Sequence, residues 1–204
     1  MVRLKDILTS IPDSVKLLFK SGPYKQQNRQ NIIFVGNILP SRIPRMAKWL
    51  KRQSTFNLVL LCRQSGFINS YINEDFDSIL LYRNKFHLLS LLKEFDPQKS
   101  LVHSFGPPCE DPAYALRKFK GKSIYDYQDL LVINFGLNAP FPYMRKGMQH
   151  ERYLLENADC IVSHSLEMQA AKKLFPNFSS KSNILFFPNY TDNDAFIDPP
   201  KKSI

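Results

Sequence analysis

The chain has 204 residues, of which 44% are hydrophobic and 23% are charged, a composition that predicts one globular domain with a substantial core. No apolar stretch approaches the roughly 20 residues of a transmembrane helix. Residues 1–28 lack the apolar segment of a signal peptide. The three cysteines, Cys62, Cys109 and Cys160, form no zinc-ligand spacing. These features predict a cytoplasmic protein with reduced thiols.

The net charge of +10 predicts an anionic partner: a phospholipid surface, a phosphorylated small molecule or nucleic acid. Nucleic acid ranks last, because the basic residues are scattered and no basic-aromatic motif of a nucleic-acid module is present. Residues 1–30 combine two short amphipathic patterns with an excess of lysine and arginine. We expect a helical appendage there, which packs against the main domain or rests on an anionic membrane surface.

From residue 31 onward, apolar runs alternate with helical stripes. The runs that predict seven strands cover residues 32–35, 58–61, 79–82, 101–103, 123–125, 160–162 and 184–187. This alternation predicts right-handed βαβ units and a mostly parallel sheet covered by helices on both faces. We therefore expect an α/β, Rossmann-like, three-layer domain over residues 31–196, followed by a tail or interdomain linker at 197–204.

Side chains that can cap helices lie before several of the helical stripes. Asn84 is expected to cap one helix, and Asp111 another with Pro112 at its first position. Glu151 lies on the apolar stripe of a later helix, where a carboxylate needs a polar or charged partner. Ser165 is expected to cap a helix after the sixth strand.

Glycine and polar residues follow the predicted strands at the points where those strands end. Carboxyl ends of parallel strands meet at one edge of a sheet, where α/β proteins hold ligands. The residues expected to converge there are Gly36, His103, Asp126 and Ser163, and Asn37 and His164 directly follow two of them. From this segment alone, an ordinary turn and cap at Ser163 and Ser165, with His164 as a solvated loop residue, is the favoured interpretation.

The connection between the fifth and sixth strands is unusually apolar. Residues 130–143 contain leucine, isoleucine, valine, phenylalanine and tyrosine in high proportion. Such a segment either wraps the domain as ordinary core or lines a cleft or contacts lipid.

Several well-known motifs are missing. The first strand is followed by Gly36 and Asn37 but not by GxGxxG, so a dehydrogenase is disfavoured. The chain has no GxxxxGK[ST] sequence of a P-loop and no GxSxG nucleophile elbow. No cluster of metal-ligating residues is evident, and no metal site is predicted.

A set of residues in a characteristic order points to one known family. They are Gly36, Val102-His103, Tyr125-Asp126, Glu151, Ala158-Asp159, Ser163, and Pro188-Asn189-Tyr190-Thr191-Asp192 followed by Phe196. Together they resemble the amino-terminal domain of glycosyltransferase family 4, whose retaining enzymes consist of two Rossmann-like domains in the GT-B architecture. The resemblance covers about residues 31–196.

The resemblance implies a role in sugar transfer. In that family the amino-terminal domain mainly holds the acceptor, a sugar or a lipid-linked molecule, and the second domain holds a nucleotide-sugar donor. No cofactor is implied, because the nucleotide-sugar is a substrate. By position, Gly36 would lie near the donor phosphates, and His103 and Asp126 would be the candidate catalytic residues at the cleft edge. The remaining substrate-binding candidates are Asn37, Ser163, His164 and Asn189.

Two departures from the family pattern shape the expected function. Phe105 stands where several members carry a second histidine, and the sequence ends at Ile204, where a linker to the second domain would begin. We expect an acceptor-binding half of a transferase that lacks the donor-binding domain and is inactive alone. A separate donor-domain chain or self-association would complete it, and it could lie peripherally at the inner membrane face. The alternative is a non-catalytic binding or regulatory protein that retains the fold.

Overall fold

A computed structural model describes residues 29–37, 42–53, 55–63, 75–106, 108–127, 141–163, 169, 171–173 and 183–186. The predictions for residues 1–28, the connection at 130–140, His164, Ser165, Asn189 and the tail at 197–204 lie outside these residues.

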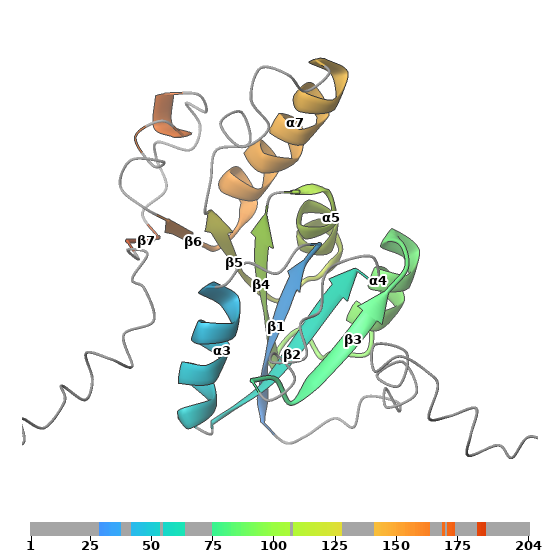
Figure 1. Ribbon diagram of the computed structural model, residues 1–204, viewed down its shortest axis with the longest axis vertical. Coiled ribbons are helices and arrows are strands. Elements are labelled where there is room, and N and C mark those ends of the chain that lie inside the picture. The colour runs from blue at the N-terminus through green and yellow to red at the C-terminus, as the bar shows by residue number, and fades with distance from the viewer. Residues whose placement is uncertain are drawn as a thin grey trace, which may run out of the picture.

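Seven strands form one sheet (Figure 1), in the order β3-β2-β1-β4-β5-β6-β7. All six pairings between neighbouring strands are parallel, which confirms the predicted Rossmann-like sheet. The strands are β1 (Gln30–Gly36), β2 (Phe56–Arg63), β3 (Ser78–Tyr82), β4 (Ser100–Gly106), β5 (Lys122–Tyr127), β6 (Cys160–Ser163) and β7 (Ile184–Phe186).

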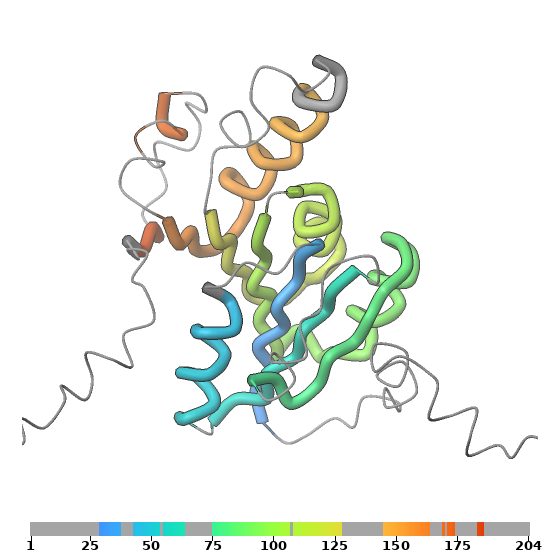
Figure 2. The backbone as a smooth tube through the Cα atoms, in the orientation of Figure 1, coloured from blue at the N-terminus to red at the C-terminus, as the bar shows by residue number. Residues whose placement is uncertain are grey.

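Helices lie on both faces of this sheet, and Figure 2 follows the chain through them. They are α3 (Arg42–Arg52), α4 (Lys85–Leu92), α5 (Glu110–Lys118) and α7 (Phe141–Asn157). The last begins at Phe141, so the apolar connection before it is shorter than the sequence pattern indicated. None of the helices in the described part of the chain has the length and apolar character needed to cross a membrane.

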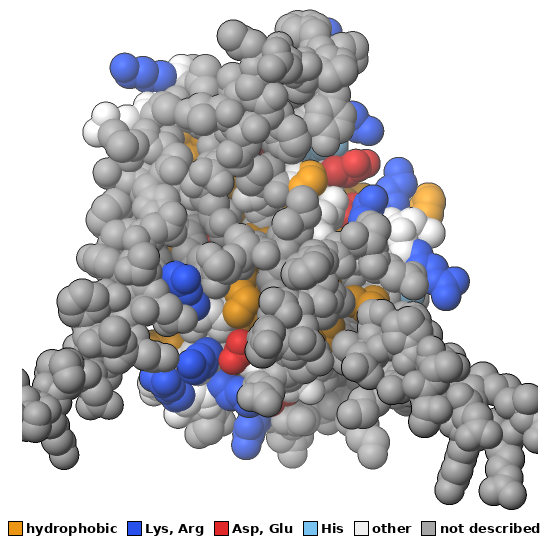
Figure 3. Space-filling model, in the orientation of Figure 1, with side chains coloured by type: hydrophobic (Ala, Val, Ile, Leu, Met, Phe, Trp, Pro, Cys, Tyr) orange, Lys and Arg blue, Asp and Glu red, His pale blue; other side chains and the backbone are white. Residues whose placement is uncertain are grey.

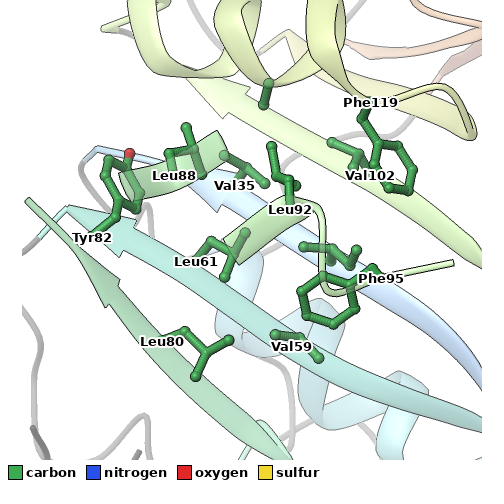
Figure 4. Close-up of a cluster of buried hydrophobic side chains, with 12 residues drawn as sticks. Val35, Val59, Leu61, Leu80, Tyr82, Leu88, Leu92, Phe95, Val102 and Phe119 are labelled. Atoms are coloured by element: carbon green, nitrogen blue, oxygen red, sulfur yellow. The ribbon is translucent and has the colours of Figure 1, made fainter. Parts of the chain in front are cut away.

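The core is divided between the two faces because successive side chains of a strand point to opposite sides. On one face, Ile43 and Ala47 of α3 pack with Phe34 of β1 and with Leu58 and Leu60 of β2. On the other face, α4 and α5 cover a cluster of aliphatic and aromatic side chains (Figure 4). This cluster includes Ile33, Val35, Val59, Leu61, Tyr82, Leu88, Leu92 and Val102.

Two of the three predicted helix caps lie within the described residues, and they have different outcomes. Asn84 caps α4 as predicted, because its side chain accepts hydrogen bonds from the backbone N–H groups of Phe86 and His87, both at 3.0 Å. The prediction for Asp111 is wrong: Cys109 is the capping residue of α5, and Asp111 lies in the first turn. Its carboxylate instead binds Arg63 and Tyr82. A buried carboxylate needs charged and hydrogen-bonding partners, and the guanidinium and the hydroxyl group provide them.

A side-chain contact ties the α7–β6 junction to β5. Asp159 accepts hydrogen bonds from the backbone N–H of Ser123 at 2.9 Å and from the Ser123 hydroxyl at 2.8 Å. The carboxylate thereby fixes the start of β6 beside β5, and with it the register of the strand that ends at Ser163.

Candidate functional site

The strand order reverses between β1 and β4, and ligands of doubly wound sheets bind at the carboxyl edge beside such a point. The register pairs Phe34 with His103 and pairs Phe105 with Asp126. Paired residues of parallel strands point to the same face, and so do residues two apart on one strand. These four side chains therefore share the face of the sheet on which α3 packs.

His103 and Asp126 form the polar part of this face. The Nε2 atom of His103 lies 3.6 Å from the Oδ2 atom of Asp126, and the two side chains are only 5% and 0% exposed. The imidazole ring stacks on Phe34, with ring centroids 5.1 Å apart and an angle of 27° between the planes. The structure thus brings the two candidate catalytic residues together. An imidazole and a carboxylate so placed can accept or donate a proton at a hydroxyl group.

Gly36 and Phe105 form the apolar part of the same face. A Cβ atom at position 36 would overlap the Phe105 ring, whose side chain is almost completely buried. Close approach of the ring, rather than a left-handed backbone, is therefore what requires glycine at this position. The ring occupies the space through which a ligand would approach Gly36 from this face, and the proposed contact of Gly36 with donor phosphates stays a prediction.

A hydrogen-bonded network lies on the opposite face of the sheet, also at the carboxyl ends of the strands. The sequence analysis did not predict it. Arg63 donates through Nε and Nη2 to the two carboxylate oxygens of Asp111, both at 2.8 Å. The Tyr82 hydroxyl lies 2.8 Å from Asp111 Oδ2, 3.0 Å from Asn37 Oδ1 and 3.3 Å from the carbonyl oxygen of Gly36. The network connects the ends of three strands to the first turn of α5.

The charges of this network reinforce one another. The hydrogen bond that Arg63 donates to Asp111 raises the pKa of the guanidinium, which stays protonated. Burial, and then the negative charge of Asp111, raise the pKa of the Tyr82 hydroxyl well above its usual range. Tyr82 thus remains a hydrogen-bond donor, and its single proton is best placed on the charged Asp111. Asn37 is positioned by this network rather than beside His103.

Ser163 is not brought together with His103 and Asp126. The register pairs Asp126 with Val162 and pairs Ser163 with Tyr127, which belongs to the core under α5 and α7. Ser163 ends its strand at the same edge of the sheet, but its buried side chain points to the face opposite Asp126.

A second buried polar cluster lies between β5 and the helices α5 and α7. Cys109 Sγ lies 3.4 Å from the Tyr125 hydroxyl, and Glu151 of α7 is fully buried. Burial, followed by the negative charge of Glu151, raises the pKa of Cys109 to about 12. Within the described residues, no group of histidine, cysteine and carboxylate side chains could hold a metal ion.

Because of these buried thiols, we expect the free energy of unfolding to fall in alkaline solution. Burial raises the pKa of Cys62 from 9.0 to about 11, and that of Cys109 to about 12. Their stabilising effect is complete below pH 9 and is lost as pH rises through the raised values, because the unfolded thiols then release protons first. Each thiol contributes a fall of up to about 1.4 kcal/mol per pH unit.

Urea unfolding between pH 8 and pH 10 measures this fall. The variant Cys109→Ala should show a shallower decline than the wild type, since it lacks one of the two buried thiols with a raised pKa. A wild-type stability that stays flat across this interval would contradict the expectation.

Comparison with known proteins gives the fold but not a family. No protein-family model and no curated protein matches the sequence. Sucrose-phosphate synthase from Thermosynechococcus elongatus is structurally similar, with a TM-score of 0.50 and 15% identity, over 80% of this chain and 49% of that one. An α-glucosyltransferase solved in complex with UDP and a 13-mer DNA containing an HMU base has a TM-score of 0.53 and 16% identity, over 81% and 44%.

The chain thus spans about half the length of the structures it matches. Its seven-stranded parallel sheet and the helices on both faces form a Rossmann-like domain, which matches one half of a GT-B glycosyltransferase structure. At this level of identity the likeness shows the fold alone.

Proposed function

We propose that this domain holds the acceptor in a retaining, nucleotide-sugar-dependent glycosyl transfer, and that a second domain holds the donor. The observation that carries the proposal is the contact between His103 and Asp126, 3.6 Å apart on one face beside the β1–β4 switch point. The match to one half of GT-B structures supports it. The donor domain belongs either to the same protein or to a partner chain.

In this proposal the acceptor, a sugar or a lipid-linked sugar, lies at the carboxyl edge of β4 and β5. The carboxylate of Asp126 accepts a hydrogen bond from the acceptor hydroxyl group, and His103 limits the orientation of that hydroxyl group. Positioning of the nucleophilic oxygen is the contribution of this domain. The leaving diphosphate is stabilised by the donor domain.

A second candidate function is a non-catalytic binding or regulatory protein that keeps the fold. The observation that favours it is the Phe105 ring, which is buried against Gly36 where donor phosphates would approach. The two candidates differ in whether His103 and Asp126 contact a sugar.

The assay that tests the proposal combines turnover with binding. We expect no hydrolysis or transfer when the purified chain is incubated with UDP-, GDP- and ADP-sugars, because donor contacts are assigned to the other domain. We expect neutral saccharides to bind, with affinity reduced about tenfold in Asp126→Asn, since a hydrogen bond to a charged group is lost. Glu156→Gln, which removes the charge of a partly buried carboxylate paired with the exposed Arg152, is the matched control.

Two results would count against this assignment. Rapid turnover by the chain alone would refute the division of roles between two domains. Saccharide binding that is equally strong in a folded Asp126→Asn variant would refute the acceptor site and leave the non-catalytic alternative.

A further inference from the structure

Helix α3 carries a concentration of positive charge. Its sequence, RIPRMAKWLKR, contains five basic residues and no acidic residue. Ile43 and Ala47 are completely buried against the sheet and define the inner side of the helix. At about 100° per residue, Arg45, Lys48 and Arg52 lie on the outer side. The helix therefore presents one basic face away from the core.

The same surface contains the single tryptophan of the chain. Trp49 is 58% exposed, whereas most large apolar side chains of the sheet and its helices are buried. It follows Arg45 by four residues and precedes Arg52 by three, so it lies beside both on the helix surface. An indole with an exposed body and a polar N–H group suits the boundary between water and lipid.

Among the described residues, Asp77 is an acidic side chain that contacts α3. Lys51 Nζ lies 3.9 Å from a carboxylate oxygen of Asp77 at the start of β3, which offsets part of the charge on one flank. Figure 3 shows lysine and arginine side chains at the lower left, where α3 lies in Figure 1, with an acidic side chain beside them.

We propose that α3 docks the domain on an anionic phospholipid surface, with its axis parallel to the bilayer. Arg45, Lys48 and Arg52 contact the lipid headgroups, and the indole of Trp49 enters the interfacial layer. The apolar side of the helix stays on the sheet, so the association is peripheral and sensitive to salt. This inference does not depend on the proposed sugar transfer.

A bilayer fits this surface better than a nucleic acid does. Proteins that bind single strands pair a basic groove with several aromatic side chains, on which successive bases stack. The outer face of α3 offers one aromatic side chain on a convex helix. One indole among several cations is sufficient for a lipid interface.

Because Trp49 is the only tryptophan, its fluorescence reports directly on α3. Phosphatidylcholine vesicles containing about one third phosphatidylglycerol should shift its emission to shorter wavelength and carry the protein upward in flotation. Vesicles of phosphatidylcholine alone should do neither, and added salt should reverse the binding.

Charge reversal locates the contact. The double variant K48E/R52E should bind anionic vesicles at least about tenfold more weakly than the wild type. The control K120E/K122E changes the net charge equally at two exposed residues around the α5–β5 turn, and should bind like the wild type. Trp49→Ala should also weaken flotation, without a change in charge, and urea unfolding confirms that each variant is folded.

Three outcomes would overturn the proposal. One is an unchanged Trp49 emission spectrum together with no flotation on anionic vesicles. Another is equal loss of binding in both double variants, which would indicate attraction by net charge alone. The third is binding to a single-stranded oligonucleotide through α3 when anionic vesicles are ignored.

Discussion

The variant Asp111→Ala should lower the free energy of unfolding by about 3 kcal/mol, because it breaks an ion pair and leaves its partners without their acceptor. Asp111 is 1% exposed and accepts two hydrogen bonds from Arg63 and one from Tyr82, all at 2.8 Å. The Arg63 side chain is 33% exposed, so water can solvate the guanidinium in the variant, and the loss lies at the lower end of the range for buried pairs.

The neighbouring residue offers a matched control. Glu110 lies in the same first turn of α5, but it is half exposed and lies 3.8 Å from Lys146, which is more exposed still. Glu110→Ala should therefore cost less than about 1 kcal/mol. Urea unfolding of the two variants measures the difference, and equal losses would show that the buried network contributes no more than a surface ion pair.

The variant Phe105→Ala should destabilise the protein by about 3–5 kcal/mol, since the ring is buried at the β1–β4 switch point and its removal leaves a cavity. Gly36→Ala should cost about 1–3 kcal/mol in the wild type, because the new methyl group overlaps that ring. In the Phe105→Ala background the added methyl group should cost little, as the space it needs is then empty.

This double-mutant cycle measures the coupling between the two positions. The expected coupling free energy is about 1–3 kcal/mol, in the direction that makes the double variant more stable than the sum of the single changes predicts. Additive effects would show that the glycine is required for another reason.

Local sequence patterns were sufficient to predict the strands and their parallel direction. Buried parallel strands produce continuous apolar runs, and the helices between them have their own spacing, so both signals are contained in short windows. The cap at Asn84 was predictable for the same reason. The backbone N–H groups that donate to its side chain belong to residues at most three positions further along the chain.

The site depended on information that short windows lack. Asp111 binds Tyr82 and Arg63, which are 29 and 48 residues away in the sequence. Aspartate is typical of helix caps, so the sequence pattern predicted a cap and not these distant partners. Ser163 was grouped with Asp126 because both end strands, although the pleat places their side chains on opposite faces. The overlap of Phe105 with Gly36 follows from the adjacency of β1 and β4, which the sequence order alone does not specify.

The central claim is that the face bearing His103 and Asp126 contacts a sugar, and the histidine rings provide a selective test. The chain has four histidines, so ring resonances in nuclear magnetic resonance spectra can be assigned by single substitutions. His87 lies in the first turn of α4 and His150 lies on α7, and they serve as internal references.

Titration with neutral mono- and disaccharides should shift the ring resonances of His103 and leave those of His87 and His150 in place. The same titration of Asp126→Asn should show a much smaller shift at His103. Saccharide titrations that leave the His103 resonances of the folded wild-type protein unchanged would contradict the acceptor-side assignment.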